Sequence, residues 1–187
     1  MKELGNKPLC FPQPVFMIGT YDKDNNPNLM NAAWGGISND DEMTICLGNN
    51  HKTTENILLK GELTVSMATR STVKECDFFG IATGKKTINK IEVAGFHAMK
   101  APHVDAPIFK ELPLSIECKV ISYDAESCRL DLKIINVLAD ESIINENGKV
   151  DPMLLEPIAF DPFNNGYLVV KERVGNAFKD GVELLKK

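Results

Sequence analysis

The sequence lacks the motifs of the common nucleotide and metal sites. The five cysteines lie far apart, are odd in number and form no CxxC pair, which argues against a disulfide framework and a zinc site. No GxGxxG follows a strand-like run, and Gly84-Lys85-Lys86-Thr87 is no P-loop because Phe79 stands where the earlier glycine is required. The three histidines show no metal-ligand spacing. The sequence therefore predicts no metal site and gives no support for hydrolysis.

An excess of positive charge and a long apolar run are also missing. The chain has 187 residues, 43% of them hydrophobic and 25% charged, which is ordinary for a globular protein. Its net charge of −5 gives a nucleic-acid partner no electrostatic support. Residues 1–8 lack the apolar core of a signal peptide, and no window is long enough to span a bilayer. We expect one domain over residues 1–187, in the cytoplasm, with no membrane partner.

The hydrophobic pattern predicts a mainly β fold. Residues 114–121 and 130–137 alternate between apolar and polar side chains, which is typical of half-buried antiparallel strands. Further strands are predicted at 15–21, 28–34, 43–47 and 63–68, with shorter ones around Ile143, Ile158 and Leu168, and helices at 53–60, 72–81 and from 174 to 178. Many antiparallel strands with few helices favour a closed or half-closed β-barrel over a doubly wound fold.

One polar segment has the composition of a phosphate site. Asn50, His51, Lys52, Thr53 and Thr54 stand at the start of the predicted helix 53–60. A helix N-terminus carries partial positive charge and unpaired N–H groups, so it binds phosphate readily. Ordinary capping by Asn and Thr, with Lys52 in solvent, explains the same residues.

A wall of small residues precedes that segment. Asn31, Ala32, Ala33 and Trp34 are followed by Gly35-Gly36, so that a strand backbone can approach a flat ring closely. Trp34 can equally be a core or interface residue. Taken together, the two segments suggest a planar ligand with a phosphate. Thr83, Gly84, Lys85 and Lys90 can clamp such a ligand, although solvent-exposed lysines are common.

The order and spacing of several segments resemble the flavin reductase-like, FMN-binding split-barrel family, close to its flavoredoxin branch. The resemblance spans most of the chain and rests on the segments 14–20, 31–36, 51–57, 77–80, 83–85, 105–107, 112–118 and 139–142. It implies a Greek-key split barrel that forms a homodimer with FMN near the subunit interface.

The resemblance also assigns roles to residues. It implies that Asn31, Ala32, Ala33 and Trp34 line the isoalloxazine ring, and that residues 50–54 hold the ribityl chain and phosphate. Thr83, Gly84, Lys85 and Lys90 match a loop that closes on the flavin, where relatives have Ser-Gly-Arg and this chain has Thr-Gly-Lys. Lys85 keeps the charge but loses the bidentate fork of arginine. No catalytic residue is predicted, because the flavin itself carries out the redox chemistry.

The implied function is an FMN-dependent oxidoreductase, either a flavin reductase or a flavoredoxin-type electron carrier. The electron donor, NAD(P)H or a redox protein, and the acceptor stay open at this point. Two alternatives also stay open: a non-catalytic FMN-binding barrel that acts as a sensor or store, and a structural dimer in which Trp34 is an interface residue and the helix at Thr53 is simply capped.

Overall fold

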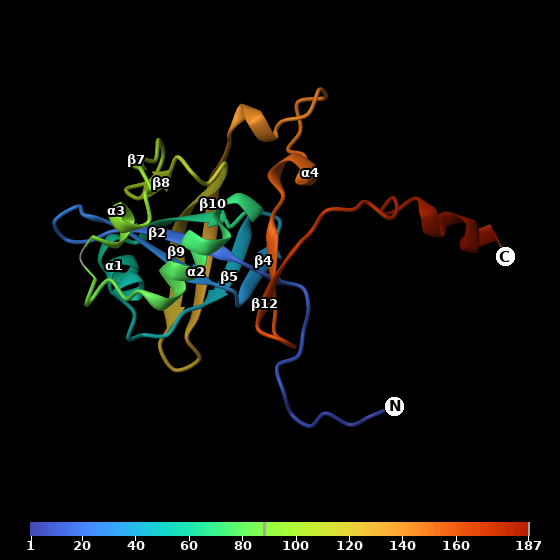
Figure 1. The fold of residues 1–187 in the computed structure, drawn as a ribbon, viewed down its shortest axis with the longest axis horizontal. Helices are drawn as coiled ribbons and strands as arrows, with labels where there is room; N and C mark the ends of the chain where they lie inside the picture. Colours follow the sequence, from blue (N-terminus) through green and yellow to red (C-terminus); the bar gives the residue numbers. More distant parts are fainter. Residues whose placement is uncertain (88, 187) are drawn as a thin grey trace.

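The computed structural model describes residues 1–87 and 89–186 and shows a β-sheet body flanked by short helices (Figure 1). The strands are β1 (Gln13–Pro14), β2 (Phe16–Tyr21), β3 (Pro27–Ala32), β4 (Gly35–Asn39), β5 (Glu42–Cys46), β6 (Glu62–Met67), β7 (Ala98–Lys100), β8 (Pro107–Phe109), β9 (Leu114–Asp124), β10 (Arg129–Ala139), β11 (Ile158–Asp161) and β12 (Gly166–Val169). The helices are α1 (Lys52–Lys60), α2 (Val73–Ile81), α3 (Lys90–Val93) and α4 (Pro152–Leu155), with 3-10 turns at Arg70–Thr72, Glu141–Ile143 and Asp180–Lys186.

The main sheet is a barrel that is split between β3 and β4. Its seven strands are ordered β3-β2-β6-β9-β10-β5-β4, and every pair is antiparallel. The two edge strands are neighbours in the chain, since only Ala33 and Trp34 separate them. Ala32 and Gly35 are three Cα steps apart, at most about 11 Å. The two edges must therefore meet at one place, and the sheet curls into a barrel without closing there.

Alternation along the strands divides the core into two layers. On β2, Phe16 and Ile18 point into the barrel and pack with Ile57 of α1. Met17 points to the opposite face and packs beneath α2 with Phe79. The strand period of two thus gives the sheet an inner apolar face and an outer apolar face covered by helix. A second sheet, β1-β11-β12, flanks the outer layer.

Local sequence explains where α1 ends and how the long hairpin forms. Gly61 adopts a left-handed conformation (φ 69°), and its N–H donates to the carbonyl of Ile57 at 2.8 Å, which terminates the helix. Strands β9 and β10 follow the alternating pattern that predicted them and extend it to Asp124 and Ala139. The prediction of a mainly β barrel with few helices is confirmed.

Three local predictions are wrong. Residues around Ile143 form a 3-10 turn instead of a strand, because Asp140 accepts a hydrogen bond from the N–H of Ser142 at 2.9 Å and caps the turn. The predicted strand 28–34 stops at Ala32, since the chain must cross the split. Residues 174–178 are not helical, and the C-terminal 3-10 turn begins only at Asp180.

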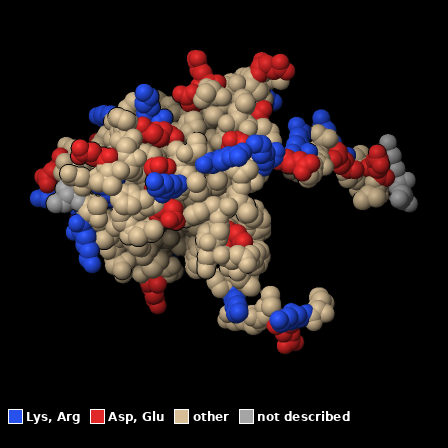
Figure 2. All heavy atoms as spheres, in the orientation of Figure 1, with Lys and Arg blue, Asp and Glu red and all other residues tan. Residues whose placement is uncertain are grey.

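Both ends of the chain leave the body as extended arms on the same side of the molecule (Figure 1). On the face shown in Figure 2, acidic and basic side chains are interspersed over the body and the arms, without a field of one sign. In the described part of the chain, no helix has the length and apolar character needed to cross a membrane.

Candidate functional site

A hollow of about 360 Å³ lies at the split of the barrel. Strand β3 and the crossing residues form one wall, the start of α1 forms another, and the end of α2 with the following loop forms the third. Ten residues that the sequence analysis singled out line it: Asn31, Ala32, Ala33, Trp34, His51, Lys52, Thr53, Thr83, Gly84 and Lys90. The volume lies within the range of small-molecule sites, about 300–1,000 Å³.

The β3 wall offers backbone groups to a ligand. Strand β3 pairs only with β2, so it is an edge strand of the main sheet. Every second residue of an edge strand directs its N–H and C=O outward, away from the sheet. Ala32 and Ala33 have short side chains that leave this edge open, and Trp34 beside them is 59% exposed. A flat ring with polar atoms along one edge fits such a wall.

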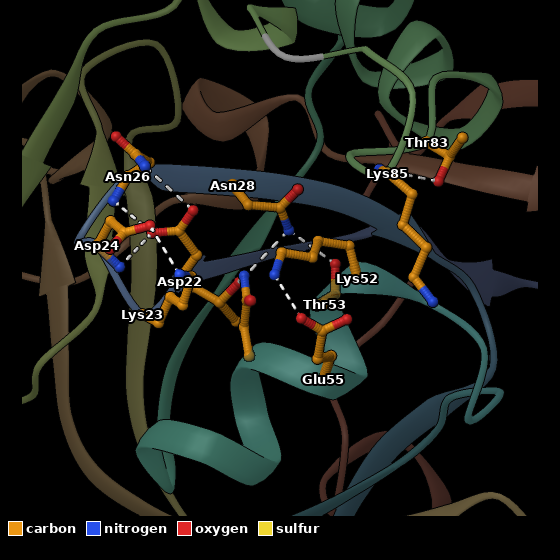
Figure 3. A network of polar contacts seen from close by, with 12 residues as sticks. Asp22, Lys23, Asp24, Asn26, Asn28, Lys52, Thr53, Glu55, Thr83 and Lys85 are labelled. Carbon is orange, nitrogen blue, oxygen red and sulfur yellow. Dashed lines mark hydrogen bonds and ion pairs between the residues drawn. The ribbon is translucent and has the colours of Figure 1, made fainter.

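The N-terminus of α1 forms the second wall. His51 occupies the N-cap position, and no side chain accepts a hydrogen bond from the first turn there. The ammonium of Lys52 pairs with Glu55 at 2.6 Å. The hydroxyl of Thr53 accepts a hydrogen bond from Nδ2 of Asn28 at 2.8 Å (Figure 3). The first-turn N–H groups, with the helix dipole behind them, make this end of α1 attractive for an anion.

Two other residues of the predicted phosphate segment do not line the hollow. Asn50 is exposed in the turn before the helix. Thr54 is 1% exposed, and its hydroxyl donates to the carbonyl of Gly48 at 2.8 Å, which ties the turn to the helix. Thr54 thus holds the shape of the turn instead of facing a ligand.

Lys90 provides a buried cation. The residue is 4% exposed, and its ammonium lies 5.9 Å from the centre of the Phe79 ring. Among the described residues, no hydrogen bond or ion pair reaches this ammonium. Burial lowers the pKa of Lys90 from 10.5 to about 8. An unpaired buried charge is costly, so the site favours an anionic ligand that pairs with it.

The loop after α2 closes over the hollow by a close backbone approach. A Cβ at Gly84 would lie 2.7 Å from Oδ1 of Asn28 and 3.3 Å from Cγ of Lys52, so only glycine fits there without a shift. Thr83 lines the hollow, and its hydroxyl accepts a bond from the N–H of Lys85 at 3.4 Å (Figure 3). Lys85 itself is exposed and lines neither this hollow nor the next one.

A second hollow of about 740 Å³ adjoins the first. The two share Lys52, Gly84 and Lys90, so these residues stand at the junction of one continuous groove. The larger hollow continues between the β2–β3 turn and α3. A ligand with a ring in the first hollow and an anionic tail at the junction would meet both lysines.

Asn28 is a site residue that the sequence analysis did not single out. Asn28 is only 6% exposed, and its Nδ2 donates to the hydroxyl of Thr53. Its Oδ1 is buried and has no hydrogen-bond partner in the described part of the chain. The sequence does carry a signal for Asn28: it is an amide on the same face of β3 as Met30 and Ala32, where an apolar residue is expected. The end of α2 also lines the hollow, at residues 79–82.

Contacts behind the hollow fix α2 against β3 and β12. Nδ2 of Asn31 donates to the carbonyl of Cys76 at 3.0 Å. The Tyr167 hydroxyl of β12 donates to Asp77 at 2.8 Å, and burial together with this carboxylate raises the pKa of Tyr167 to about 12. Asn31 therefore serves the site at least partly by positioning α2.

The chemistry of the walls is that of binding. The described residues that line the first hollow offer edge backbone groups, an uncapped helix N-terminus and two lysines, and no carboxylate is among them. Within residues 1–87 and 89–186, no group of three or more metal-ligating side chains comes together. The arrangement suits a flat ring that carries an anionic tail.

Comparison with known proteins identifies the family. Residues 9–156 match the flavin reductase like domain. Flavoredoxin of Desulfovibrio vulgaris (Miyazaki F) superposes with a TM-score of 0.92 at 33% identity, covering 97% of this chain and 99% of that one. Flavoredoxin from Methanosarcina acetivorans gives 0.88 at 25% identity, covering 98% and 99%. An uncharacterized protein of Aquifex aeolicus is 24% identical over 164 residues, 80% of this chain and 81% of that protein. The chain therefore belongs to the flavin reductase-like family, in its flavoredoxin branch.

Proposed function

We propose that the protein is an FMN-binding oxidoreductase that passes electrons through the bound flavin, as a flavin reductase or a flavoredoxin-type carrier. The observation that carries the proposal is the buried ammonium of Lys90, which has no anionic partner among the described residues and lies at the junction of the two hollows. The names of the flavoredoxin relatives support the flavin, and the cation supports a flavin that carries a phosphate.

The residues present fit FMN on both ends. The phosphate would be held by the first-turn N–H groups of α1 together with Lys52 and Lys90, and Gly84 would let the loop close over it. The polar edge of the ring would face the free backbone edge at Ala32 and Ala33. The sequence predicted Asn50, Thr54 and Lys85 as binding residues too; none of the three lines the first hollow, so their contact with FMN stays a prediction.

Bound FMN supplies the redox chemistry, accepting a hydride or electrons and giving them to an acceptor. The protein's part is to bind and orient the ring and to set its electrostatic surroundings. Lys52 and Lys90 bring positive charge to the anionic tail, and the backbone edge offers donors to the ring. The donor is NADH, NADPH or a redox protein, and the acceptor is a small molecule or a redox protein.

We propose further that the protein acts as a homodimer. Two large apolar side chains stand at the mouth of the hollow, Trp34 at 59% and Ile81 at 77% exposure. Such side chains around a ligand site indicate a surface that is covered in the working protein. A second subunit would shield them and limit the access of water to the flavin.

The test begins with an absorption spectrum of the purified protein. We expect a yellow protein, or a colourless one that turns yellow with added FMN, and bleaching of the flavin band by NADH, NADPH or dithionite. Riboflavin, which lacks the phosphate, should bind at least about 100-fold more weakly than FMN, because two charge-assisted contacts at roughly 1.5 kcal/mol each are lost.

The outcomes separate the candidate functions. Bleaching by NADH or NADPH identifies a reductase, and bleaching by dithionite alone, with oxidation by an added acceptor, identifies a carrier fed by a protein. If the protein binds flavin but catalyses no electron transfer with any donor–acceptor pair, the alternative function of a flavin store or sensor is favoured. A protein that binds neither FMN nor riboflavin refutes the proposal.

A further inference from the structure

Among the described residues, the C-terminal arm (residues 170–185) is bonded to the body only at its root. Every residue in it is exposed, and in Figure 1 it extends away from the body beyond β12. Its root is fixed by the N–H of Val170, which donates to the carbonyl of Pro157 at 3.0 Å, and by Lys171, which pairs with Glu156. Beyond Lys171, the hydrogen bonds of the described arm residues stay within the arm; those of Asn176 with Arg173 and Asp180 are examples.

The arm nevertheless has the side chains of an interface. Val174 is 90% exposed, Phe178 102% and Leu185 85%, and Leu184 lies beside Leu185 in the same 3-10 turn. Figure 2 shows the arm standing clear of the body, with charged groups set between uncharged atoms. Apolar side chains of this size gather on an isolated segment when another surface covers them.

The body carries a fitting surface next to the flavin site. An outer hollow of about 680 Å³ is lined by Leu9, Cys10, Trp34, Cys46, Phe160 and Pro162, together with neighbouring residues of the N-terminal arm. It shares Trp34 and Cys46 with the site hollow, so the two hollows are the two sides of one wall. Its volume is sufficient for several large apolar side chains.

A second copy of this chain is the occupant that the geometry favours. The far end of the C-terminal arm lies away from the N-terminal arm (Figure 1), and residues of the N-terminal arm line the outer hollow. In a twofold dimer the same contact forms twice, arm of one copy to body of the other, and the exchange closes without leaving a free arm. Each dimer would then cover both arms and both outer hollows.

We propose that the C-terminal arm of each subunit docks in the outer hollow of its partner, against Trp34. The proposal rests on the homodimer of the proposed function and adds the segment that holds it together. The partner's arm would then back the Trp34 wall of the flavin hollow, so that the site is complete only in the dimer.

Full-length point variants test the docking. Phe178→Ser combined with Leu185→Ser removes two apolar anchors from each arm, and Leu154→Ser on α4, where the leucine is 52% exposed, is the matched control. Sedimentation velocity gives the dimer dissociation constant. Trp34 is the single tryptophan, so quenching of tryptophan fluorescence by acrylamide in the flavin-free protein measures how far Trp34 is shielded from solvent. FMN binding is measured separately by absorbance, and circular dichroism confirms folding.

We expect a full-length dimer with a shielded Trp34. The double variant should dissociate at least about 100-fold more readily, since each large buried side chain contributes on the order of tenfold, and its Trp34 should become freely quenched. Leu154→Ser should match the unmodified chain. A double variant that stays dimeric, or a full-length dimer whose Trp34 is quenched as easily as in the dissociated variant, overturns the docking and leaves the FMN proposal intact. A full-length monomer overturns both the docking and the homodimer, whatever its FMN affinity.

Discussion

Replacing Lys90 with methionine should stabilise the ligand-free protein and weaken FMN binding. Methionine keeps most of the side-chain volume and removes the charge. Lys90 is 4% exposed and has no anionic partner among the described residues, and burial lowers its pKa from 10.5 to about 8. The two expected effects have opposite signs, which separates a ligand-binding role of Lys90 from a purely structural one.

The stability effect follows from the pKa. A tenfold change in a protonation equilibrium is about 1.4 kcal/mol, so charged Lys90 costs the ligand-free fold roughly 3 kcal/mol below pH 8. Between pH 8 and 10.5 the folded state releases the proton while the unfolded state keeps it, so stability rises with pH there. Above pH 10.5 the cost is gone. Lys90→Met should therefore be more stable than the unmodified protein at pH 7. The gain is up to about 3 kcal/mol from the removed charge, reduced by roughly 1 kcal/mol for the lost contact with Phe79. Above pH 10.5 the variant should gain little stability.

The binding effect follows from the phosphate. A charge-assisted hydrogen bond contributes about 1.5–3 kcal/mol, so FMN affinity should fall roughly 10- to 150-fold in Lys90→Met. Riboflavin affinity should stay the same, because riboflavin has no phosphate. In the unmodified protein, FMN affinity should weaken by up to about tenfold per pH unit above pH 8, where free Lys90 loses its proton.

Urea unfolding at pH 7 and pH 10.5 measures the first effect, and fluorescence titration with FMN and riboflavin measures the second. Lys86→Met is the control, because Lys86 is exposed in the same loop and the net charge changes equally. A variant that is less stable at pH 7, or one that binds FMN as tightly as the unmodified protein, would show that Lys90 is not an unpaired cation facing the ligand.

Two further substitutions test the loop and the core. Gly84→Ala should weaken FMN binding at least about tenfold with little change in stability, because its Cβ would meet Oδ1 of Asn28 at 2.7 Å and push the loop off the hollow; titration measures this. Glu117→Gln should lower the free energy of unfolding by about 1.5–3 kcal/mol at pH 7. The Glu117 carboxylate has no exposed surface and accepts bonds from the backbone N–H of His103, from the ring Nδ1 of His103 and from Nδ2 of Asn136, each at 2.8 Å.

Each of these two substitutions has a matched control. Gly166→Ala adds a Cβ that meets nothing within 4 Å, so FMN affinity should not change. Glu111 likewise accepts bonds from the backbone N–H and the ring Nδ1 of a histidine, His97, so Glu111→Gln is the control for Glu117→Gln. Because His97 is 74% exposed, the loss of unfolding free energy should be smaller than at Glu117. Burial opposes the low pKa of Glu117, but the bonds from Asn136 and His103 outweigh it. This contribution is present above the ordinary carboxyl pKa and is lost as the pH falls below it. Equal losses at both glutamates would refute the burial argument.

The strands and helices with strong local signals were predictable from the sequence. Alternation marked β9 and β10, and Gly61 marked the end of α1. Strand β4 was missed because Gly35–Asn39 has a single large apolar residue, Ile37, and forms a strand through its pairing with β5. Residues 174–178 were predicted as a helix, but the N–H of Asn176 bonds Oδ2 of Asp180 at 2.8 Å, and the 3-10 turn begins only at Asp180.

The site was predictable in its parts and less so in its geometry. Polar residues before a helix, and small residues beside Trp34, indicated both walls of the hollow. Nothing local shows that Thr54 turns toward Gly48 or that Asn28 supports Thr53, because both depend on how α1 packs against β3. The burial of Lys90 depends in the same way on the fold of a long loop.

Three features of the hollow each cost the ligand-free protein stability. Edge strand β3 leaves backbone groups without strand partners, α1 starts without a side-chain cap, and Lys90 holds a buried charge without a counter-ion among the described residues. Each of these features alone has an ordinary structural explanation. Their occurrence together at the split of one barrel has no such explanation. A ligand that places polar ring atoms on the strand edge and an anion at the junction would offset all three costs at once. The fold thus keeps its unsatisfied groups where binding can satisfy them, which is why we place the candidate site at the split and not in the barrel interior.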